Sequence, residues 1–306
     1  MPLGLQKLKT LFSGIGQQLV ALAFGRLSSI AFSVPIELEH LLCWVLTKGI
    51  KYRQKVVERN LEVSFPTKSR MELKAIERDF YQWFAQVIIE IAALPKVDEE
   101  WVRKKIDYGN KELLDSYFLA EPSFLALTGH FGNWEILLQT AGFYGGEKRV
   151  MGIYQPLSNA GFDAIIYALR SRFNSTPVPS KKVIRECLRS QKAYSISMVA
   201  DQAPQRGAGI TGKLCAQETM FLDGPWLLHK ALRLQACYIS MVPIARRRYK
   251  ISIEKIADSE LLPAEDFVAL YAAALSHTIQ EAPHAYLWSH RRFKHQVQYS
   301  CPLVAY

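Results

Sequence analysis

The chain has 306 residues, of which 49% are hydrophobic, and a formal net charge of +10. This length can bury a sizeable core in one large domain, and no Pro/Gly/Ser-rich linker or internal repeat divides it. The positive charge indicates an anionic partner, such as nucleic acid, anionic lipid or an acidic protein. No zinc-finger, helix-turn-helix or RNA-recognition motif accompanies the charge, so we do not expect nucleic acid to be the partner.

The five cysteines are scattered along the chain and form no C-x-x-C motif. Their odd number and irregular spacing predict neither a disulfide framework nor a zinc site, and they fit a reducing compartment. No Ser or Cys stands in a nucleophile motif such as G-x-S-x-G. We therefore expect no metal and no cofactor, and we interpret the cysteines as small apolar residues.

The first 50 residues are rich in apolar side chains at helical spacing, with Lys7 and Lys9 near the start. Residues 19–36 are apolar apart from three serines and Arg26, and Pro35 closes the stretch. A central arginine is costly in a transmembrane helix, and no convincing signal-peptide cleavage site follows. We expect residues 1–50 to form a membrane-associated helical segment lying in the interface. A spanning helix and a pair of helices docked on the core are the alternatives.

Residues 52–94 follow a helical period that breaks at Phe65-Pro66 and restarts at Ser69. From residue 123 onward, short apolar runs alternate with helical stretches. We expect strands at 123–128, 149–154, 195–200, 236–243 and 249–254, and helices near 133–143, 162–173, 181–190, 224–234 and 264–281. This alternation predicts an α/β fold over residues 51–306, with a mixed, mainly parallel sheet flanked by helices.

The residues that follow the first of these strands have the composition of a catalytic turn. Residues 128–135 read Thr-Gly-His-Phe-Gly-Asn-Trp-Glu, which places His130 at the carboxyl edge of the sheet, where open α/β sheets bind ligands. In an unbroken helix, residues five apart lie on different faces, so His130 and Glu135 can cooperate only if His130 precedes the helix. Asn133 is a suitable N-cap for that helix. The alternative is a strand-end histidine and a helix-start glutamate without a shared function, and spacing alone does not separate the two.

Other polar groups follow the neighbouring strands. Asp201-Gln202 comes after the strand at 195–200, and Tyr154-Gln155-Pro156 comes after the strand at 149–154. The next helix carries Asp163, Arg170 and Arg172. A loop aspartate and a surface arginine are the simpler interpretation of these residues individually, but the fold should gather them at the edge that holds His130.

Basic residues cluster twice in the last third of the chain. One cluster lies at 246–250 and the other at 290–295. A single cluster is usually a solvated surface, whereas two in the same third favour an anion-binding site.

Together these motifs resemble the late acyltransferases of lipid A biosynthesis, the lauroyl/myristoyl transferase family, over nearly the whole length. The histidine–four residues–acid motif matches His130 to Glu135, and the Asp-Gln/His-x-x-Pro-type element matches Asp201 to Pro204. The ending Trp-x-His-Arg-Arg-Phe-Lys matches Trp288 to Lys294. The Tyr-x-Pro-x-x-Asn element with its following Asp and Arg-x-Arg, and the helical lead-in, match the remaining positions: Tyr154, Pro156, Asn159, Asp163, Arg170 and Arg172, with Asn60-Leu61, Phe65-Pro66 and Glu90 upstream. One departure is that Met220–Pro225 stands where many members carry Phe-Phe-Gly.

The resemblance implies acyl transfer from an acyl carrier protein thioester to a hydroxyl of a phosphorylated lipid A precursor. The reaction would take place at the cytoplasmic face of the inner membrane. Both the carrier protein and the acceptor, an anionic glycolipid, would match the charge of +10. We expect His130 to be the general base and Glu135 to orient it, with direct transfer and no acyl-enzyme.

The remaining site residues follow from the same reaction. The N–H groups at Gly132 and Asn133, together with Arg170, are expected to stabilise the oxyanion, and Asp201 to position the substrate. Arg291, Arg292 and Lys294 are expected to contact a phosphate or headgroup. The alternatives are an acyltransferase with a different glycolipid, aminolipid or glycerolipid acceptor, an esterase, and a non-catalytic lipid-binding protein.

Overall fold

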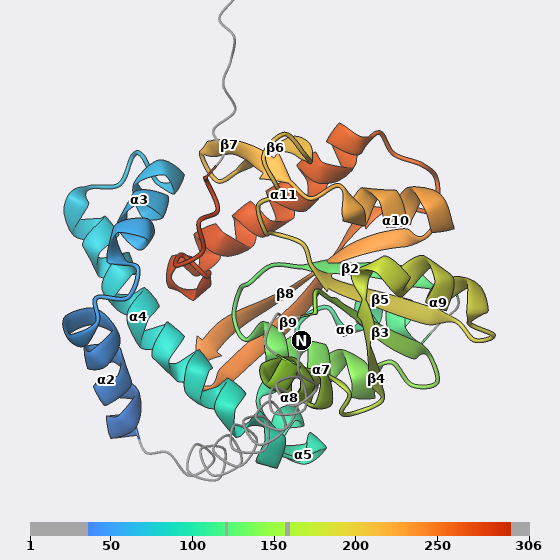
Figure 1. Ribbon diagram of the computed structural model, residues 1–306, viewed down its shortest axis with the longest axis horizontal. Helices are drawn as coiled ribbons and strands as arrows, with labels where there is room; N and C mark the ends of the chain where they lie inside the picture. Colours follow the sequence, from blue (N-terminus) through green and yellow to red (C-terminus); the bar gives the residue numbers. More distant parts are fainter. Residues whose placement is uncertain (1–35, 120–121, 157–159, 295–306) are drawn as a thin grey trace, which may run out of the picture.

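The computed structural model describes residues 36–119, 122–156 and 160–294 of the chain (Figure 1). In the described residues, four helices precede the first strand, namely α2 (Ile36–Trp44), α3 (Gln54–Ser64), α4 (Arg70–Ala93) and α5 (Glu99–Arg103), and α6 (Lys111–Phe118) follows it. The later helices alternate with strands and are α7 (Trp134–Tyr144), α8 (Ala160–Arg170), α9 (Val183–Arg189), α10 (Gly224–Leu232) and α11 (Ala264–Glu281). Short turns of other helix types are η1 (Val45–Gly49), η2 (Leu94–Lys96), η3 (Ser180–Lys182) and η4 (Pro283–Ala285).

A seven-stranded sheet forms the centre, in the order β1-β9-β8-β2-β5-β3-β4. Its strands are β1 (Ile106–Tyr108), β2 (Phe124–Thr128), β3 (Arg149–Tyr154), β4 (Ser175–Pro179), β5 (Tyr194–Val199), β8 (Gln235–Ala245) and β9 (Arg248–Ala257). Strands β8, β2, β5, β3 and β4 are mutually parallel, and the β8–β9 hairpin turns β9 and its partner β1 the opposite way. The expected mixed, mainly parallel sheet flanked by helices is confirmed.

Helices cover both faces of the sheet. Successive side chains of a strand point to opposite faces, so each strand contributes to two separate cores. Leu125 and Leu127 of β2 join a core with α9, α10 and α11, whereas Phe124 and Ala126 join a core with α5, α6 and α7. Figure 1 shows α10 and α11 on one side of the sheet and α7 and α8 on the other. Both faces of β2 are therefore buried, and the chemistry available to this strand lies at its end.

All five expected strands and all five expected helices of the sheet region are present. Two strands were not expected from the sequence: β1, which has only three residues, and β4, which contains Pro177 and Pro179. Proline is tolerated in β4 because this strand lies at the edge of the sheet. A separate two-stranded sheet of β6 (Ile210–Leu214) and β7 (Gln217–Phe221) was also not anticipated.

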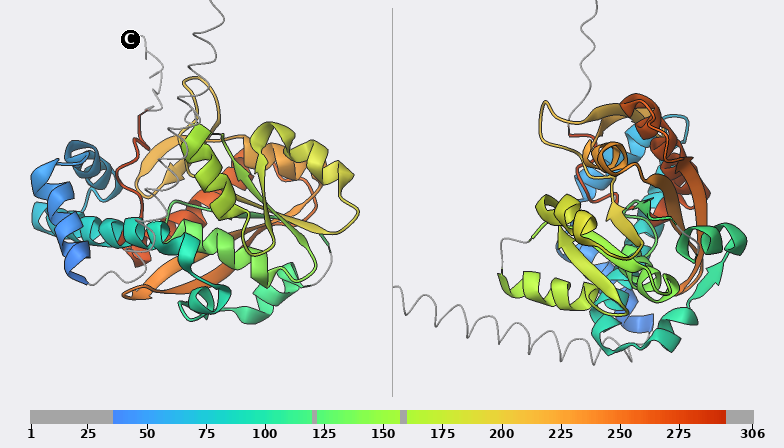
Figure 2. Two further views of the ribbon diagram at one scale, coloured as in Figure 1. Left: turned by 60° about the horizontal axis from the view of Figure 1, so that its bottom comes forward. Right: turned by 90° about the vertical axis from the view of Figure 1, so that its right-hand side faces the viewer.

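The helical lead-in forms one end of the molecule, away from α9, in both Figure 1 and the left view of Figure 2. Helix α4 begins as the sequence predicts: Ser69 accepts a hydrogen bond from the Glu72 N–H and Glu72 accepts one from the Ser69 N–H, which completes a capping box. Within the residues that the structure describes, no helix combines the length and the apolar character needed to cross a bilayer. The prediction for residues 1–35 of the expected membrane segment lies outside the described residues.

Candidate active site

The turn between β2 and α7 holds His130 outside the helix, as the spacing requires. Helix α7 starts at Trp134, and the Asn133 side chain caps it by accepting a hydrogen bond from the Ile136 N–H at 3.2 Å. Gly132 has φ +58°, and a Cβ there would lie 1.9 Å from the carbonyl oxygen of Met241. Only glycine fits this position, because its missing side chain permits both the left-handed backbone and the close approach.

A second segment clamps this turn from the far end of the chain. The Gly132 N–H donates to the Ala285 carbonyl at 2.9 Å, and the Leu287 N–H donates to the His130 carbonyl at 2.9 Å. Residues Trp288–His290 are in turn held by Asn60, whose amide nitrogen donates to the carbonyls of Trp288 and His290 at 2.7 Å each. The motifs around His130 and Trp288 are therefore two halves of one structure.

His130 pairs with Asp201 rather than with Glu135. Strands β2 and β5 are neighbours with Thr128 opposite Val199, so the residue two positions beyond each strand end meets the other. His130 Nδ1 lies 2.6 Å from Asp201 Oδ1, and the His130 backbone N–H donates to Oδ2 at 3.1 Å. The expectation that Glu135 contacts the His130 ring was wrong about the partner, because Asp201, which follows the neighbouring strand β5, contacts Nδ1 instead.

Burial and charge act in opposite directions on this pair. Burial of Asp201, which is 2% exposed, would raise its pKa, but the charge and hydrogen bonds of His130 lower the pKa to about 2. Burial likewise would lower the pKa of His130, but the charge of Asp201 and the hydrogen bond to it raise that pKa above its ordinary value. The pair therefore favours an ionised carboxylate beside an imidazole that readily accepts a proton.

Glu135 forms a separate ion pair with Arg170 on the other side of the turn. Arg170, the last residue of α8, donates from Nε to Glu135 Oε2 at 3.0 Å and from Nη2 to Oε1. Both partners are largely buried. This two-pronged geometry is the one that a guanidinium and a carboxylate prefer, which explains why Glu135 faces α8. Glu135 still influences His130, since its charge contributes to the raised pKa of the imidazole.

Two backbone N–H groups at the turn, those of Gly132 and Asn133, were expected to stabilise an oxyanion, and the first of them is already used. The Gly132 N–H is already bonded to Ala285, so its assignment as an oxyanion donor was wrong. The Asn133 side chain caps α7 through its oxygen and donates from its amide nitrogen to Glu90 Oε2 at 3.0 Å. Glu90 is fully buried, which raises its pKa, and it also accepts a hydrogen bond from the Tyr249 hydroxyl. Asn133 and Glu90 therefore fix the start of α7.

Of the three cations expected to contact a headgroup, Arg292 is placed differently by the structure. It is 1% exposed and donates to Thr219 Oγ1 at 2.9 Å and to the Met220 carbonyl at 2.8 Å. Its guanidinium also lies over the Phe221 ring, and its charge helps to lower the pKa of Asp201. Arg292 thus joins the β6–β7 hairpin to the site, whereas Arg291 and Lys294 are exposed.

Two other residues of the sequence motifs have structural surroundings. Arg172 donates to the carbonyls of Leu94 and Val97 and lies over the ring of Phe173, which ties the end of α8 to the end of α4. Tyr154 ends β3 and lies edge-on to Tyr167 of α8. Asn159 lies outside the described residues.

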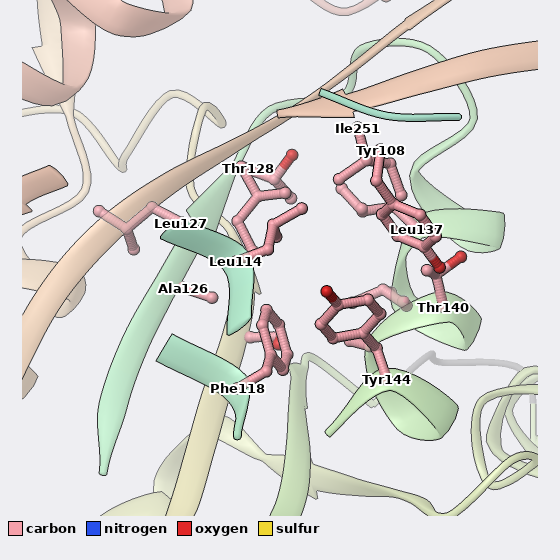
Figure 3. A pocket seen from close by; sticks show the side chains of 14 residues that line it. Tyr108, Leu114, Phe118, Ala126, Leu127, Thr128, Leu137, Thr140, Tyr144 and Ile251 are labelled. Carbon is pink, nitrogen blue, oxygen red and sulfur yellow. The ribbon is translucent and has the colours of Figure 1, made fainter. Parts of the chain in front are cut away.

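A small apolar cavity of about 30 Å³ lies between the sheet and helices α6 and α7 (Figure 3). The Phe118 and Tyr144 rings meet edge to face on one side of it, and Tyr108 and Thr128 supply hydroxyl groups. This volume offers room for about two water molecules. The cavity as it stands does not accommodate a fatty acyl chain.

Within the described part of the chain, no three His, Cys, Asp or Glu side chains are grouped to hold a metal ion. The described cysteines are free thiols, and burial raises the pKa of Cys215 to about 12 and that of Cys237 well above its ordinary value. A thiol with a raised pKa is a poor nucleophile. His130 and Asp201 are therefore the groups best suited to acid–base chemistry at this edge.

Two features of this site were missed from the sequence. The contact between His130 and Asp201 could have been anticipated from the equal two-residue offset of each from its strand end, given that the two strands are neighbours. Glu90 was recognised only as part of the helical lead-in. A carboxylate on the apolar stripe of a helix was the available signal for its burial.

Comparison with known proteins gives a consistent result. The family model described as bacterial lipid A biosynthesis acyltransferase matches residues 12–295. A lipid A biosynthesis lauroyltransferase of Escherichia coli K12 is 23% identical over 252 residues, which cover 80% of each chain. A lipid A biosynthesis palmitoleoyltransferase of the same organism is 20% identical over 247 residues, again 80% of each chain. A lipid A biosynthesis acyltransferase of Shigella flexneri has the same identity and coverage as the palmitoleoyltransferase.

Proposed function

Because the chain belongs to the bacterial lipid A biosynthesis acyltransferase family and is an acyltransferase, we propose a specific reaction for it. The protein moves a fatty acyl chain from an acyl carrier protein thioester to a hydroxyl of a phosphorylated lipid A precursor, at the cytoplasmic face of the inner membrane. The observation that supports this most directly is the His130–Asp201 pair at the carboxyl edge of the sheet. It is the geometry that a hydroxyl-activating base requires.

In this reaction Asp201 accepts the Nδ1–H of His130, which leaves the lone pair of Nε2 free to take the acceptor hydroxyl proton. The hydroxyl oxygen forms a bond to the thioester carbonyl carbon as its proton moves to Nε2. The resulting tetrahedral intermediate collapses with cleavage of the carbon–sulfur bond, and the imidazolium returns the proton to the departing thiolate. The negative charge of Asp201 stabilises the imidazolium between these steps.

Glu135 and Arg170 act beside this pair rather than within it. The Arg170 bonds to Glu135 use Nε and Nη2, so Nη1 can donate to a developing oxyanion. Glu135 holds the guanidinium in place and adds negative charge near His130. This assignment keeps both residues in the site but gives Asp201 the orienting role expected of Glu135.

The nucleophiles available support direct transfer without an acyl-enzyme. The described cysteines are free thiols, and burial raises the pKa of each of them, which makes them poor nucleophiles. Arg291 and Lys294, both exposed and near the chain segment that clamps His130, are suited to bind a phosphate of the acceptor.

The test is an in vitro assay with a panel of acyl carrier thioesters and a phosphorylated lipid A precursor, with His130→Ala as the paired variant. We expect a product one acyl chain heavier by mass spectrometry, formed only when the acceptor is present. Release of free fatty acid at the same rate without the acceptor would identify a hydrolase instead. Full activity in the His130 variant would refute the mechanism.

A further inference from the structure

Helix α9 lies at the end of the molecule opposite α2 and α3 (Figures 1 and 2), and two of its large apolar side chains are exposed to solvent. Its Val183 and Cys187 are buried in the core, so the helix is firmly seated. Ile184 and Leu188, which are 45% and 74% exposed, lie one turn apart and therefore side by side. Nothing in the packing of the described residues requires these two side chains to be apolar.

Cations surround this apolar pair. Lys181, Lys182, Arg185, Arg189 and Lys192 are all exposed, and Arg185 and Arg189 form a row next to Ile184 and Leu188. The single acid between residues 175 and 193 is Glu186, whose carboxylate is bonded to Arg149 at 2.9 Å. We call the exposed side chains of residues 181–192 the α9 surface. It is a strongly basic patch with an apolar centre.

The α9 surface begins at the edge of the sheet that carries the site. Pro179, the last residue of β4, pairs with Tyr154, the last residue of β3, and η3 then leads directly into α9. In the sheet order, β4 is three strands from β2, the strand that ends before His130. At a strand spacing of about 4.8 Å, the two strand ends are separated by roughly 14 Å. A partner bound at Lys181 and Lys182 could deliver an extended thioester arm to His130 along this edge.

We propose that the α9 surface is the docking site of the acidic carrier protein that brings the acyl chain. This proposal rests on the proposed function and specifies where its donor binds. Charge complementarity selects an acidic partner, and Ile184 with Leu188 selects one that offers a small apolar contact between its acids. A bilayer is a poorer fit, because other exposed apolar side chains, Trp44 at the end of α2 and Ile50 directly after η1, lie at the opposite end.

The charge test compares two double variants with the same spacing and the same change in charge. Arg185→Glu/Arg189→Glu alters the α9 surface, and Lys55→Glu/Arg59→Glu alters exposed cations of α3 at the other end. Binding of purified acyl carrier protein to the full-length protein is measured by fluorescence anisotropy at low and high salt. We expect the α9 variant to bind about tenfold more weakly at low salt, with the difference shrinking at high salt, and the α3 variant to bind like wild type.

The apolar test uses Leu188→Ala with Met71→Ala of α4, an 82% exposed side chain, as its control. Turnover is measured with the carrier-bound donor and with a small acyl thioester that lacks the carrier. We expect Leu188→Ala and the α9 charge variant to raise KM for the carrier-bound donor about tenfold and to leave turnover of the small thioester within about twofold. Circular dichroism confirms that each variant is folded.

The possible outcomes separate this proposal from the proposed function. Equal binding losses in the α9 and α3 variants, or absence of carrier binding by wild type, would overturn the docking proposal. So would a loss of affinity for anionic phospholipid vesicles, with carrier binding unchanged, in the α9 variant. Absence of acyl transfer by wild type with either donor would instead refute the proposed function, and the binding comparison would still decide the docking site.

Discussion

Two ion pairs flank the Gly132 turn, and their difference shows how one fold separates reactivity from structure. His130–Asp201 and Glu135–Arg170 each contain a nearly buried carboxylate with two hydrogen bonds. The first pairs its carboxylate with an imidazole, which gains and loses a proton near neutral pH, and the second with a guanidinium, which does not. The first pair can therefore move a proton, whereas the second supplies fixed charge and holds α7 against α8.

The largest expected effect comes from removing the titratable partner. His130→Ala should lower kcat by about 10²–10⁴ because the acceptor hydroxyl loses its base. The folded state should persist, since the turn is held by backbone bonds to Ala285 and Leu287. Steady-state kinetics with thermal unfolding as the folding control will measure both. A variant that remains fully active would remove the distinction between the two pairs.

The next effect comes from exchanging each carboxylate for its amide. In Asp201→Asn, the side-chain oxygen must still accept the His130 backbone N–H, so the amide NH₂ faces Nδ1 and selects the wrong tautomer. We expect kcat to fall at least about a hundredfold, as for other orienting carboxylates. Glu135→Gln, which keeps an acceptor for Arg170, should lose less than about tenfold in the same assay. The reverse order would return the orienting role to Glu135.

The structural role of the Glu135–Arg170 pair should be visible in the stability of the protein. Glu135→Ala leaves the largely buried Arg170 without its partner and should lower the free energy of unfolding by about 3 kcal/mol. Replacing both residues with Glu135→Leu/Arg170→Met should recover most of this loss, because no unpaired charge remains. Urea unfolding measures the difference. If the double variant were less stable than Glu135→Ala, the pair would not be a structural ion pair.

The smallest expected effect is a shift in pH dependence. Transfer requires neutral His130, so kcat should rise with pH through the pKa of His130, which lies above its ordinary value in the folded protein. Removing the negative charge of Asp201 lowers that pKa, so the residual activity of Asp201→Asn should rise at lower pH. Glu135→Gln should shift the profile in the same direction by less, because Glu135 contributes less to the raised pKa. An unchanged profile in both variants would show that His130 is not the titrating base.

The local features of this protein follow from short stretches of sequence. The restart of the helical pattern at Ser69 and the Asn133 cap were predicted, and the placement of His130 before α7 was recognised as a requirement, because each depends on residues within one turn of one another. The five strands recognised from their apolar runs were also found. Strand β4 was missed because its two prolines are permitted only by an edge position, which a local pattern does not reveal.

The sequence by itself determined that His130 stands at a strand end with acids within reach, and it identified the motifs by which the family is recognised. Only the tertiary structure decided which acid meets the imidazole. Asp201 lies 71 residues from His130, and their contact depends on β5 pairing with β2. The same holds for Arg292, which reads as a surface cation but is buried beneath the β6–β7 hairpin. Local spacing determines which face a side chain occupies, whereas the order of strands in the sheet determines what it faces.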